Sequence, residues 1–407
     1  MRDLLLKKNP KDFDVATNAT PKQVEALFPK TVAVGAQFGV MIVILEENNF
    51  EVATFRADKG YADGRHPTGV RFTDAKEDAL RRDFTVNGLF YDPVKRKVLD
   101  WVHGKKDLKT KTLRAIGDPK KRFTEDKLRM LRAVRFASVL GFKIEPKTFS
   151  AAKKLSSKIR EVSYERVRDE LVKMFTGPDP GLALTLLDKT GLLKEVLPEV
   201  HKMKGVQQPR AFHPEGDVFV HTRLLMGQLK NPDAVLAFGC LLHDVGKPDT
   251  FKRSDRIRFN GHDRVGTAIT QKILERLRFS NDIKNRIVAC VEGHMRFKDV
   301  KQMRESTLKK FLQRETFETE LEQHKIDCLA SHGDLSNWRF LKKKIKMLSR
   351  EEIKPVPLLN GRDLLGLGYS EGPLIGKILK SVEEAQLEGT LATKEDALRW
   401  VKENFSP

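Results

Sequence analysis

The chain has 407 residues, 40% of them hydrophobic and 32% charged, and no run of eighteen apolar residues, which argues against a membrane span. This length allows two to four globular domains. The net charge of +20 favours a polyanionic partner, most simply nucleic acid, although a basic surface that only maintains solubility is the alternative. Aromatic residues make up 8%, so base stacking is not expected to be the main mode of binding.

The cysteines and the N-terminus indicate the compartment. Cys240, Cys290 and Cys328 are far apart and odd in number, which predicts neither a disulfide framework nor a zinc knuckle. The N-terminus lacks the basic, apolar and small-residue regions of a signal peptide. We therefore expect a cytoplasmic protein.

The elements predicted along the chain are mixed at first and helical later. The β-branched run 31–45 and the segment 50–56 predict a β-hairpin, and 95–104 predicts another strand that ends in a turn. From Thr124 onward, long amphipathic segments predict helices. The expected fold class is therefore α+β, with boundaries near 115, within 202–217 and near Pro355.

Two carboxylates stand close to the start of the chain. In KDFDVA, Asp12 and Asp14 would point the same way if the segment were a strand. Like charges side by side require a cation, for which Mg²⁺ is the usual choice, and Glu51 on the predicted hairpin could supply a third oxygen ligand. A solvated turn with surface acids is the alternative, because Asp-x-Asp is common.

Two further segments concentrate charge. In EDALRRDFTVNGLFYD (77–92), Arg81 and Arg82 suit phosphate, while Asp83 with Asn87 suits a ribose hydroxyl. In RFTEDKLRMLRAVRFASVLGF (122–142), Thr124 is predicted to cap a helix whose polar face carries Asp126, Arg129, Arg132 and Arg135. Leu128, Leu131 and Val134 fall off that face and are expected to pack. A solvated charged stripe is the alternative.

With RDLLL…KDFDVAT, RRDFTVNGL and EDKLRMLRAVRFASVLGF in this order, the chain resembles the class II tRNA nucleotidyltransferases, which include CCA-adding enzymes and bacterial poly(A) polymerases. The resemblance continues through 354–401. It implies a polymerase-β-type palm over 1–115, a helical neck over 116–201 and, after a further module over 202–350, a helical tail over 351–407. The implied partners are tRNA, CTP and ATP.

The resemblance also implies roles for single residues. Asp12 and Asp14, with Glu51, would hold catalytic Mg²⁺. Asp126 and Arg129 would read the base edge as a protein template, since a carboxylate accepts from the amino group of C or A and is repelled by the carbonyl of U or G. The remaining nucleotide-binding residues would be Arg2, Arg82, Asp83, Asn87, Arg132 and Arg135.

The sequence of the predicted hairpin indicates which nucleotides the enzyme would add. Poly(A) polymerases of this group carry a Gly-basic-basic-Phe stretch there, whereas this chain has VGAQFGV (34–40), which favours CCA addition and leaves poly(A) synthesis as the alternative. An enzyme that only hydrolyses phosphates and an RNA-binding protein without catalysis are rivals from other classes.

Spaced histidines and acids form a second pattern. It includes VFVHT, CLLHDVGKP and KIDCLASHGD, and it resembles the HD phosphohydrolases. By that resemblance a second divalent metal would be bound by His221, His243, Asp244 and Asp327, with His262 and His294 as further pocket candidates. The expected activity removes a 2′,3′-cyclic phosphate or a 3′-phosphate from tRNA ends, and a degenerate module kept as structure is the alternative.

Two regional features complete the sequence predictions. Gly104–Phe136 carries twelve Lys and Arg against four acids, which suits the phosphates of a tRNA acceptor stem. The family begins with a strand and a Gly-Gly-x-Val-Arg-Asp turn, of which this chain matches only Arg2 and Asp3. One hypothesis is that a GTG valine codon was taken as the start and the true start lies upstream; the rival is a real truncation.

Overall fold

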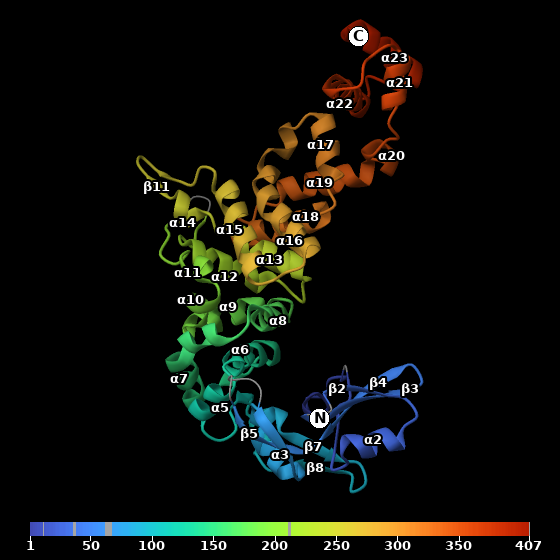
Figure 1. Cartoon of the computed structure of the whole chain (residues 1–407). Helices are drawn as coiled ribbons and strands as arrows, with labels where there is room; N and C mark the ends of the chain where they lie inside the picture. The colour runs from blue at the N-terminus through green and yellow to red at the C-terminus, as the bar shows by residue number, and fades with distance from the viewer. Residues whose placement is uncertain (11, 36–37, 62–66, 211–212, 407) are drawn as a thin grey trace. The chain divides into compact units, whose positions relative to one another are not determined.

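A computed structural model describes residues 1–10, 12–35, 38–61, 67–210 and 213–406. The chain forms two compact units (Figure 1). Unit 1 comprises Met1–Lys202, Leu229–Ala234 and Ile273–Phe279, and unit 2 comprises Met203–Gln228, Val235–Lys272 and Ser280–Pro407. Within the described ranges, none of the helices combines the length and the apolar character that crossing a bilayer requires.

Unit 1 starts with a short helix and a four-stranded sheet of order β1-β4-β3-β2. Strand β1 runs parallel to β4, whereas β3 pairs antiparallel with both β4 and β2. The elements are α1 (Arg2–Leu5), β1 (Val15–Thr17), α2 (Pro21–Leu27), β2 (Thr31–Gly35), β3 (Val40–Leu45) and β4 (Asn48–Thr54).

The predicted hairpin is confirmed at β3 and β4, but the run 31–45 is divided between two strands. Gly39 has a φ of +80°, and a Cβ atom at this position would lie 3.1 Å from the Phe72 ring and 3.2 Å from Thr54 Cβ. The chain therefore turns where a side chain would be strained and crowded. Ala36 and Gln37, within the motif used to favour CCA addition, lie outside the described residues.

One face of the sheet is covered by α2. Met41, Val43 and Val52 are buried against Val24 of this helix. Because side chains alternate along a strand, Glu51 lies on the opposite face from Val52, and it is exposed. The sheet thus has one apolar face and one face that is free to carry polar groups.

A second layer of short elements links the sheet to the helices. It contains two antiparallel pairs, β5 with β6 and β7 with β8, so the predicted strand within 95–104 is confirmed at β8. The elements are β5 (Arg56–Tyr61), β6 (Pro67–Phe72), α3 (Ala75–Arg81), the 3₁₀ helix η2 (Thr85–Asn87), β7 (Leu89–Asp92), β8 (Lys97–Asp100), α4 (Gly104–Lys109) and β9 (Thr112–Leu113).

Helices make up the rest of unit 1, and α6 packs against α8 and α9. Leu131 and Val134 of α6 are fully buried and Leu128 is 7% exposed, as predicted. The elements are α5 (Pro119–Glu125), α6 (Leu128–Leu140), β10 (Lys143–Ile144), α7 (Pro146–Leu155), η3 (Ser156–Glu161), α8 (Tyr164–Phe175), α9 (Pro180–Lys189), α10 (Leu192–Val196) and α11 (Pro198–His201).

The predicted helix cap at Thr124 is wrong. Asp118 caps α5 by accepting from Lys120 N at 3.1 Å, and Pro119 occupies the first position of the helix. Thr124 lies inside this helix and donates to Lys120 O. The stronger start signal at Asp118-Pro119 therefore begins the helix earlier, and Asp126 ends it in an extended conformation.

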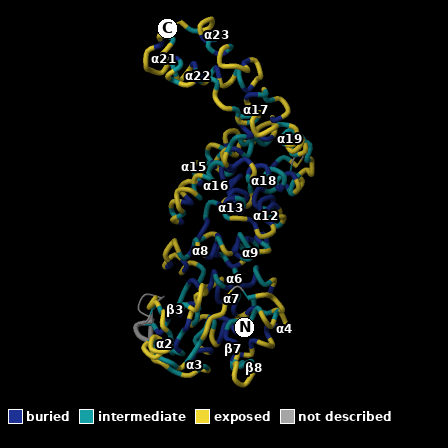
Figure 2. The backbone as a smooth tube through the Cα atoms, turned by 90° about the vertical axis from the view of Figure 1, so that its right-hand side faces the viewer, coloured by how far each residue is buried: buried dark blue, intermediate teal, exposed yellow. Residues whose placement is uncertain are grey.

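Unit 2 is almost entirely helical. Helix α13 is almost wholly buried: Val235 and every residue from Ala237 to Leu242 are shielded from solvent (Figure 2). The elements are α12 (Val218–Gln228), α13 (Ala234–Leu242), α14 (Lys247–Thr250), β11 (Lys252–Arg253), β12 (Ile257–Arg258), α15 (His262–Arg276), α16 (Asn281–Gly293), η4 (His294–Gln302), α17 (Glu305–Leu312), α18 (Phe317–Ala330), α19 (Ser336–Met347), α20 (Arg350–Ile353), α21 (Gly361–Gly366), α22 (Pro373–Leu387) and α23 (Lys394–Asn404).

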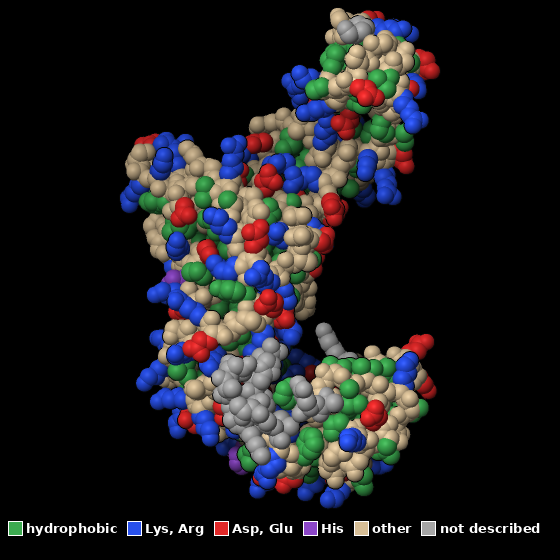
Figure 3. Space-filling model, viewed as in Figure 1, with side chains coloured by type: hydrophobic (Ala, Val, Ile, Leu, Met, Phe, Trp, Pro, Cys, Tyr) green, Lys and Arg blue, Asp and Glu red, His purple; other side chains and the backbone are tan. Residues whose placement is uncertain are grey.

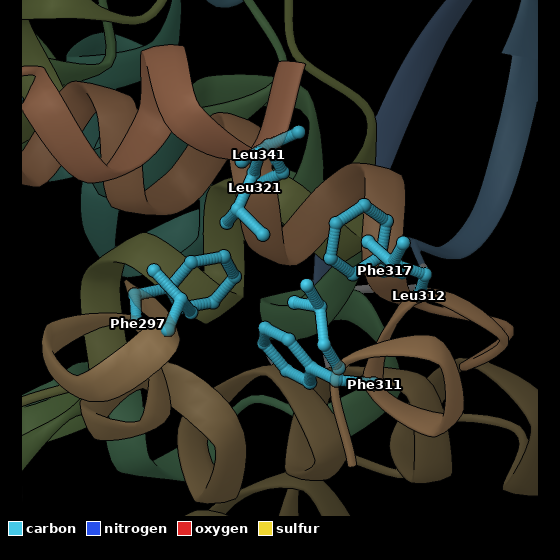
Figure 4. Close-up of a cluster of buried hydrophobic side chains, with 8 residues drawn as sticks. Phe297, Phe311, Leu312, Phe317, Leu321 and Leu341 are labelled. Atoms are coloured by element: carbon cyan, nitrogen blue, oxygen red, sulfur yellow. The ribbon is translucent and has the colours of Figure 1, made fainter. Parts of the chain in front are cut away.

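Two apolar clusters hold the C-terminal part of unit 2 together. Phe297, Phe311 and Phe317 converge with Leu321 and Leu341 between η4, α17, α18 and α19 (Figure 4). A separate cluster joins α21, α22 and α23. The α22 end is tied to α17 because the Glu388 carboxylate accepts from Ser306 N at 3.0 Å.

Candidate functional site

The predicted magnesium ligands lie where β1 begins. Asp12 and Asp14 precede this strand, so they are not within it as the sequence analysis supposed, and both are exposed. The parallel register pairs Val15 with Val52, so Asp14 and Glu51 are the residues that come directly before this pair in the two segments. Exposed carboxylate oxygens are the donors that Mg²⁺ prefers, so these residues fit that ion.

The three carboxylates do not converge as closely as the histidine cluster described below. Among the residues that the structure describes, the groups of three candidate ligands with atoms within 4.8 Å of one another all belong to unit 2.

Asp83 is the centre of a polar network in unit 1. Its carboxylate accepts from Arg132 Nε at 2.8 Å, from Asn87 Nδ2 at 3.0 Å and from Phe84 N at 2.8 Å. Asn87 in turn accepts from Arg2 Nη1 at 2.8 Å. Burial opposes ionisation of Asp83, but Arg132 and the hydrogen bond from Asn87 outweigh it and lower its pKa. The network thus joins four of the predicted nucleotide-binding residues: Arg2, Asp83, Asn87 and Arg132.

Cations gather around the ring of Phe136. The guanidinium carbons of Arg2, Arg132 and Arg135 lie 5.1, 5.2 and 4.0 Å from its centroid. Arg82 stacks on a different ring, Phe90, at 4.4 Å. Guanidinium groups suit phosphate oxygens. Each of the three is also paired with a carboxylate here, Arg2 with Asp3, Arg132 with Asp83 and Arg135 with Glu170.

The two predicted base-reading residues have different partners. Asp126 accepts from Arg166 Nη2 at 3.2 and 3.1 Å. Arg129 donates to the Glu125 carboxylate at 2.8 Å and to Arg122 O at 3.1 Å. The structure therefore places Asp126 in an ion pair that the sequence analysis did not predict.

Unit 2 holds a dense cluster of histidines and acids. His221 Nε2 lies 2.9 Å from Asp327 Oδ1, and His243 Nε2 lies 3.2 Å from Asp244 Oδ2. His262 Nε2 lies 3.1 Å from His294 Nε2. All six residues that the sequence singled out are therefore brought together, from α12, the turn after α13, α15, η4 and α18.

Three of these histidines have their tautomer fixed. The Nδ1 atoms of His243, His262 and His294 lie 2.8, 2.8 and 2.6 Å from the carbonyl oxygens of Cys240, Phe259 and Val291. A hydrogen on Nδ1 leaves Nε2 with a free lone pair, which is the usual arrangement of a metal-ligating histidine. Burial is the main cause that lowers the pKa of His294 to about 4, so its imidazole is neutral at pH 7.

The acids of the cluster also favour a positive charge among the histidines. Burial opposes protonation of His221, but Asp327 and Glu215 outweigh it and raise its pKa to about 9. Both ring nitrogens of His221 and Asp327 Oδ1 lack a hydrogen bond of good geometry although they are buried. Close but unbonded donor atoms fit a divalent metal, for which imidazole and carboxylate together are suitable ligands.

Family models match three parts of the chain. The poly(A) polymerase head domain matches residues 1–114, the RNA- and SrmB-binding site of polymerase A matches 141–204, and a tRNA nucleotidyltransferase domain 2 matches 264–401. A CCA-adding enzyme of Streptococcus uberis is 31% identical over 399 residues, which cover 97% of this chain and 88% of that protein.

The chain belongs to the tRNA nucleotidyltransferase family. An A-adding tRNA nucleotidyltransferase of Deinococcus radiodurans is 32% identical over 351 residues, covering 81% of this chain and 80% of that protein. A CCA-adding enzyme of Bacillus licheniformis is 41% identical over 213 residues, covering 52% and 53%. The chain spans about half the length of several such curated relatives.

The fold agrees with this family. The crystal structure of a Bacillus stearothermophilus CCA-adding enzyme in complex with CTP superposes with a TM-score of 0.72 at 24% identity, covering 99% of this chain and 90% of that chain. The predicted α+β class and the resemblance to tRNA nucleotidyltransferases are therefore confirmed. The HD resemblance and the individual residue roles stay predictions.

Sequence reasoning missed several residues that the geometry brings to these sites. Arg166 and Glu170 of α8 pair with Asp126 and Arg135. Glu215 Oε1 lies 2.8 Å from His221 Nδ1 and 3.1 Å from His213 Nδ1. The only sequence signal was the His-Pro-Glu triplet six residues before His221.

Proposed function

We propose that this tRNA nucleotidyltransferase adds CCA to the 3′ end of tRNA from CTP and ATP. The observation that carries the proposal is the whole-length similarity to a CCA-adding enzyme, combined with the Asp83–Arg132–Asn87–Arg2 network beside the cations around Phe136. The A-adding relative from Deinococcus makes A addition a second possible product, next to poly(A).

The proposed chemistry divides among three groups of residues. Asp12, Asp14 and Glu51 would hold Mg²⁺, which supplies positive charge to the attacking and leaving oxygens of phosphoryl transfer. Arg2, Arg132 and Arg135 orient the triphosphate by charge-assisted hydrogen bonds. Asp126 accepts from the amino group of C or A.

Nucleotide addition to a defined tRNA tests this proposal. The chain is incubated with Mg²⁺, a tRNA that lacks its last three nucleotides, and each labelled nucleotide in turn. Two C and one A are expected; a single A without C would assign A addition, and a long run of A would assign poly(A) synthesis. Asp14→Asn should lower addition by at least about a hundredfold, whereas Glu25→Gln, at an exposed position of α2, should not.

We infer a second activity, metal-dependent hydrolysis of a terminal phosphate of RNA, at the histidine cluster of unit 2. The supporting observation is the set of buried imidazole and carboxylate groups with three fixed tautomers. His221, His243, Asp244 and Asp327 would hold the divalent ion, which supplies Lewis-acid activation of water. Lys247 Nζ, 2.7 Å from Asp244 Oδ2, places a cation beside them for a substrate phosphate.

Metal content and hydrolysis test this second activity separately. The purified chain should retain a divalent metal through dialysis, and it should open a 2′,3′-cyclic phosphate or release a 3′-phosphate. His243→Ala should abolish both metal retention and hydrolysis while CCA addition continues. Asp14→Asn should abolish CCA addition while metal retention and hydrolysis continue. Metal-free protein without hydrolysis would leave the cluster as a structural part of unit 2.

A further inference from the structure

A short β-hairpin of unit 2, formed by β11 and β12, joins two segments that supply residues to the histidine cluster. The chain enters the hairpin from α14, which follows the turn carrying His243 and Asp244, and it leaves into α15, which begins at His262. In Figure 1 the hairpin, labelled β11, projects from unit 2 beside α14 and α15. Its side chains are therefore placed to meet a ligand that is bound at the cluster.

Aromatic rings of the hairpin continue to the cluster. The ring centroids of Phe251 and Phe259 lie 5.9 Å apart. Lys247 Nζ lies 5.3 Å from the centroid of Phe259 and 2.7 Å from Asp244 Oδ2. The Phe259 ring also lies 6.5 Å from the ring of His262. Phe259 and Lys247 thus form a continuous path from Phe251 to the carboxylate of the cluster.

The outer end of this path is open to solvent. Phe251 is 39% exposed, whereas Phe259 is only partly exposed. Every nucleobase has a flat face that can stack on such a ring, so stacking of this kind does not depend on base identity. Phe251 therefore offers a stacking surface next to the cluster.

The hairpin also concentrates positive charge. Lys252 lies directly opposite Arg258 in the two-stranded ladder, a placement of like charges that is unfavourable on its own. Arg258 is compensated by Asp255, whose Oδ1 lies 2.9 Å from its Nη1. In contrast, Lys252, Arg253 and Arg256 are exposed and make no ion pair with another residue that the structure describes. These three cations suit the phosphates of a nucleic-acid backbone.

We propose that the β11–β12 hairpin is an RNA-binding element that presents the 3′ end of an RNA strand to the histidine cluster. The inference rests on the hydrolytic activity inferred for that cluster. The last base stacks on Phe251, and upstream phosphates contact Lys252, Arg253 and Arg256. The terminal phosphate then lies at Lys247. The hairpin thereby makes an RNA end a better substrate than a small phosphate ester.

The test compares two phosphate monoesters as substrates of the full chain, an oligoribonucleotide with a 3′-phosphate and glycerol phosphate. Phe251→Ala should lower the ratio of their kcat/KM values by about tenfold, through the KM of the oligonucleotide, because one stacking contact is lost. Phe251→Trp should keep the ratio. Tyr91→Ala is the matched control, since Tyr91 is an exposed aromatic residue of a different hairpin, β7–β8.

Salt dependence tests the cations of the hairpin separately. Lys252→Gln with Arg253→Gln should raise the KM of the oligonucleotide and flatten its dependence on salt, because fewer counterions are released on binding. An unchanged ratio of kcat/KM values in folded Phe251→Ala, or an equal loss for both esters, would overturn the inference while leaving the inferred hydrolysis intact.

Photocrosslinking covers the case in which the unaltered chain hydrolyses neither ester. An oligoribonucleotide that ends in 4-thiouridine 3′-phosphate is irradiated with the full chain, and the crosslinked peptide is identified by mass spectrometry. A crosslink within 247–259 that is lost in Phe251→Ala supports the inference although the inferred hydrolysis has failed. Crosslinks confined to other parts of the chain, or none at all, would overturn the inference as well.

Discussion

Asp83 shows how one buried carboxylate connects separate elements of unit 1. It is 7% exposed and joins Arg132 of α6 to Asn87 of η2. Replacing it with Asn leaves the guanidinium without its counter-charge. We expect Asp83→Asn to lower the free energy of unfolding by about 2 kcal/mol at pH 7, as measured by urea denaturation.

The same substitution predicts a pH dependence. The pKa of Asp83 is lowered in the folded chain from its usual 3.8, so its ionised form stabilises the fold above that value. This stabilisation is lost as the pH falls below 3.8 toward the folded pKa, because the folded chain must then take up a proton that it resists. The difference in free energy of unfolding between the unaltered chain and Asp83→Asn should therefore shrink at low pH. The control Glu25→Gln should have the same free energy of unfolding as the unaltered chain at every pH.

The residue types singled out some members of the polar network in unit 1 as candidate site residues and missed others. Asp83, Asn87 and Arg132 stood out because carboxylate, amide and guanidinium recur in one compact set of motifs, and the structure joins them. Arg166 did not, because charges four residues apart in α8 have the pattern of an ordinary solvated helix face. Only the packing of α8 on α6 reveals that this face is turned inward.

At the scale of elements, the turn after α13 is fixed by a close backbone approach. A Cβ atom on Gly246 would lie 2.2 Å from His262 O and 2.5 Å from Gly266 N. Gly246→Ala should therefore push the turn carrying His243 and Asp244 away from α15. We expect a loss of about 1–3 kcal/mol in urea unfolding and weaker binding of a divalent metal.

A second glycine provides the control for this prediction. Gly227 in α12 has no heavy atom within 4 Å of the position that a Cβ would occupy. Gly227→Ala should be neutral or stabilising by up to about 1 kcal/mol, because alanine favours the helix. Equal stability and equal metal binding of the two variants would mean that the turn does not depend on this close approach.

Element boundaries were harder to predict than element types. The run 31–45 is apolar throughout, so periodicity could not show that it divides; the division follows from the position of Gly39 against Thr54 and Phe72, which are distant in sequence. The histidine cluster, by contrast, could be predicted as a group because its motifs are short and specific. Its distances and fixed tautomers follow from tertiary packing of α12, α13, α15 and α18 and could not be derived from the sequence.

At the scale of the whole molecule, the net charge of +20 raises the question of where the Lys and Arg side chains lie on the surface. Lys and Arg side chains gather over α7 on the face shown in Figure 3, and Lys147, Lys153 and Lys154 of this helix are exposed. This segment lies within the part matched by the RNA-binding model of polymerase A, residues 141–204. A basic helix surface of this kind suits the phosphates of an RNA stem.

Salt dependence tests whether this charge binds RNA. If six or more phosphates are neutralised, the affinity for tRNA should fall by about a thousandfold between 50 and 200 mM salt, because bound counterions are released. Lys153→Glu with Lys154→Glu should weaken binding and flatten the slope of log K against log salt. Lys95→Glu with Lys97→Glu changes the net charge equally on the exposed β7–β8 hairpin and should leave the slope nearly unchanged. An equal effect of both pairs would indicate that overall charge, and not the α7 surface, attracts the RNA, and a slope near zero would contradict phosphate contacts altogether.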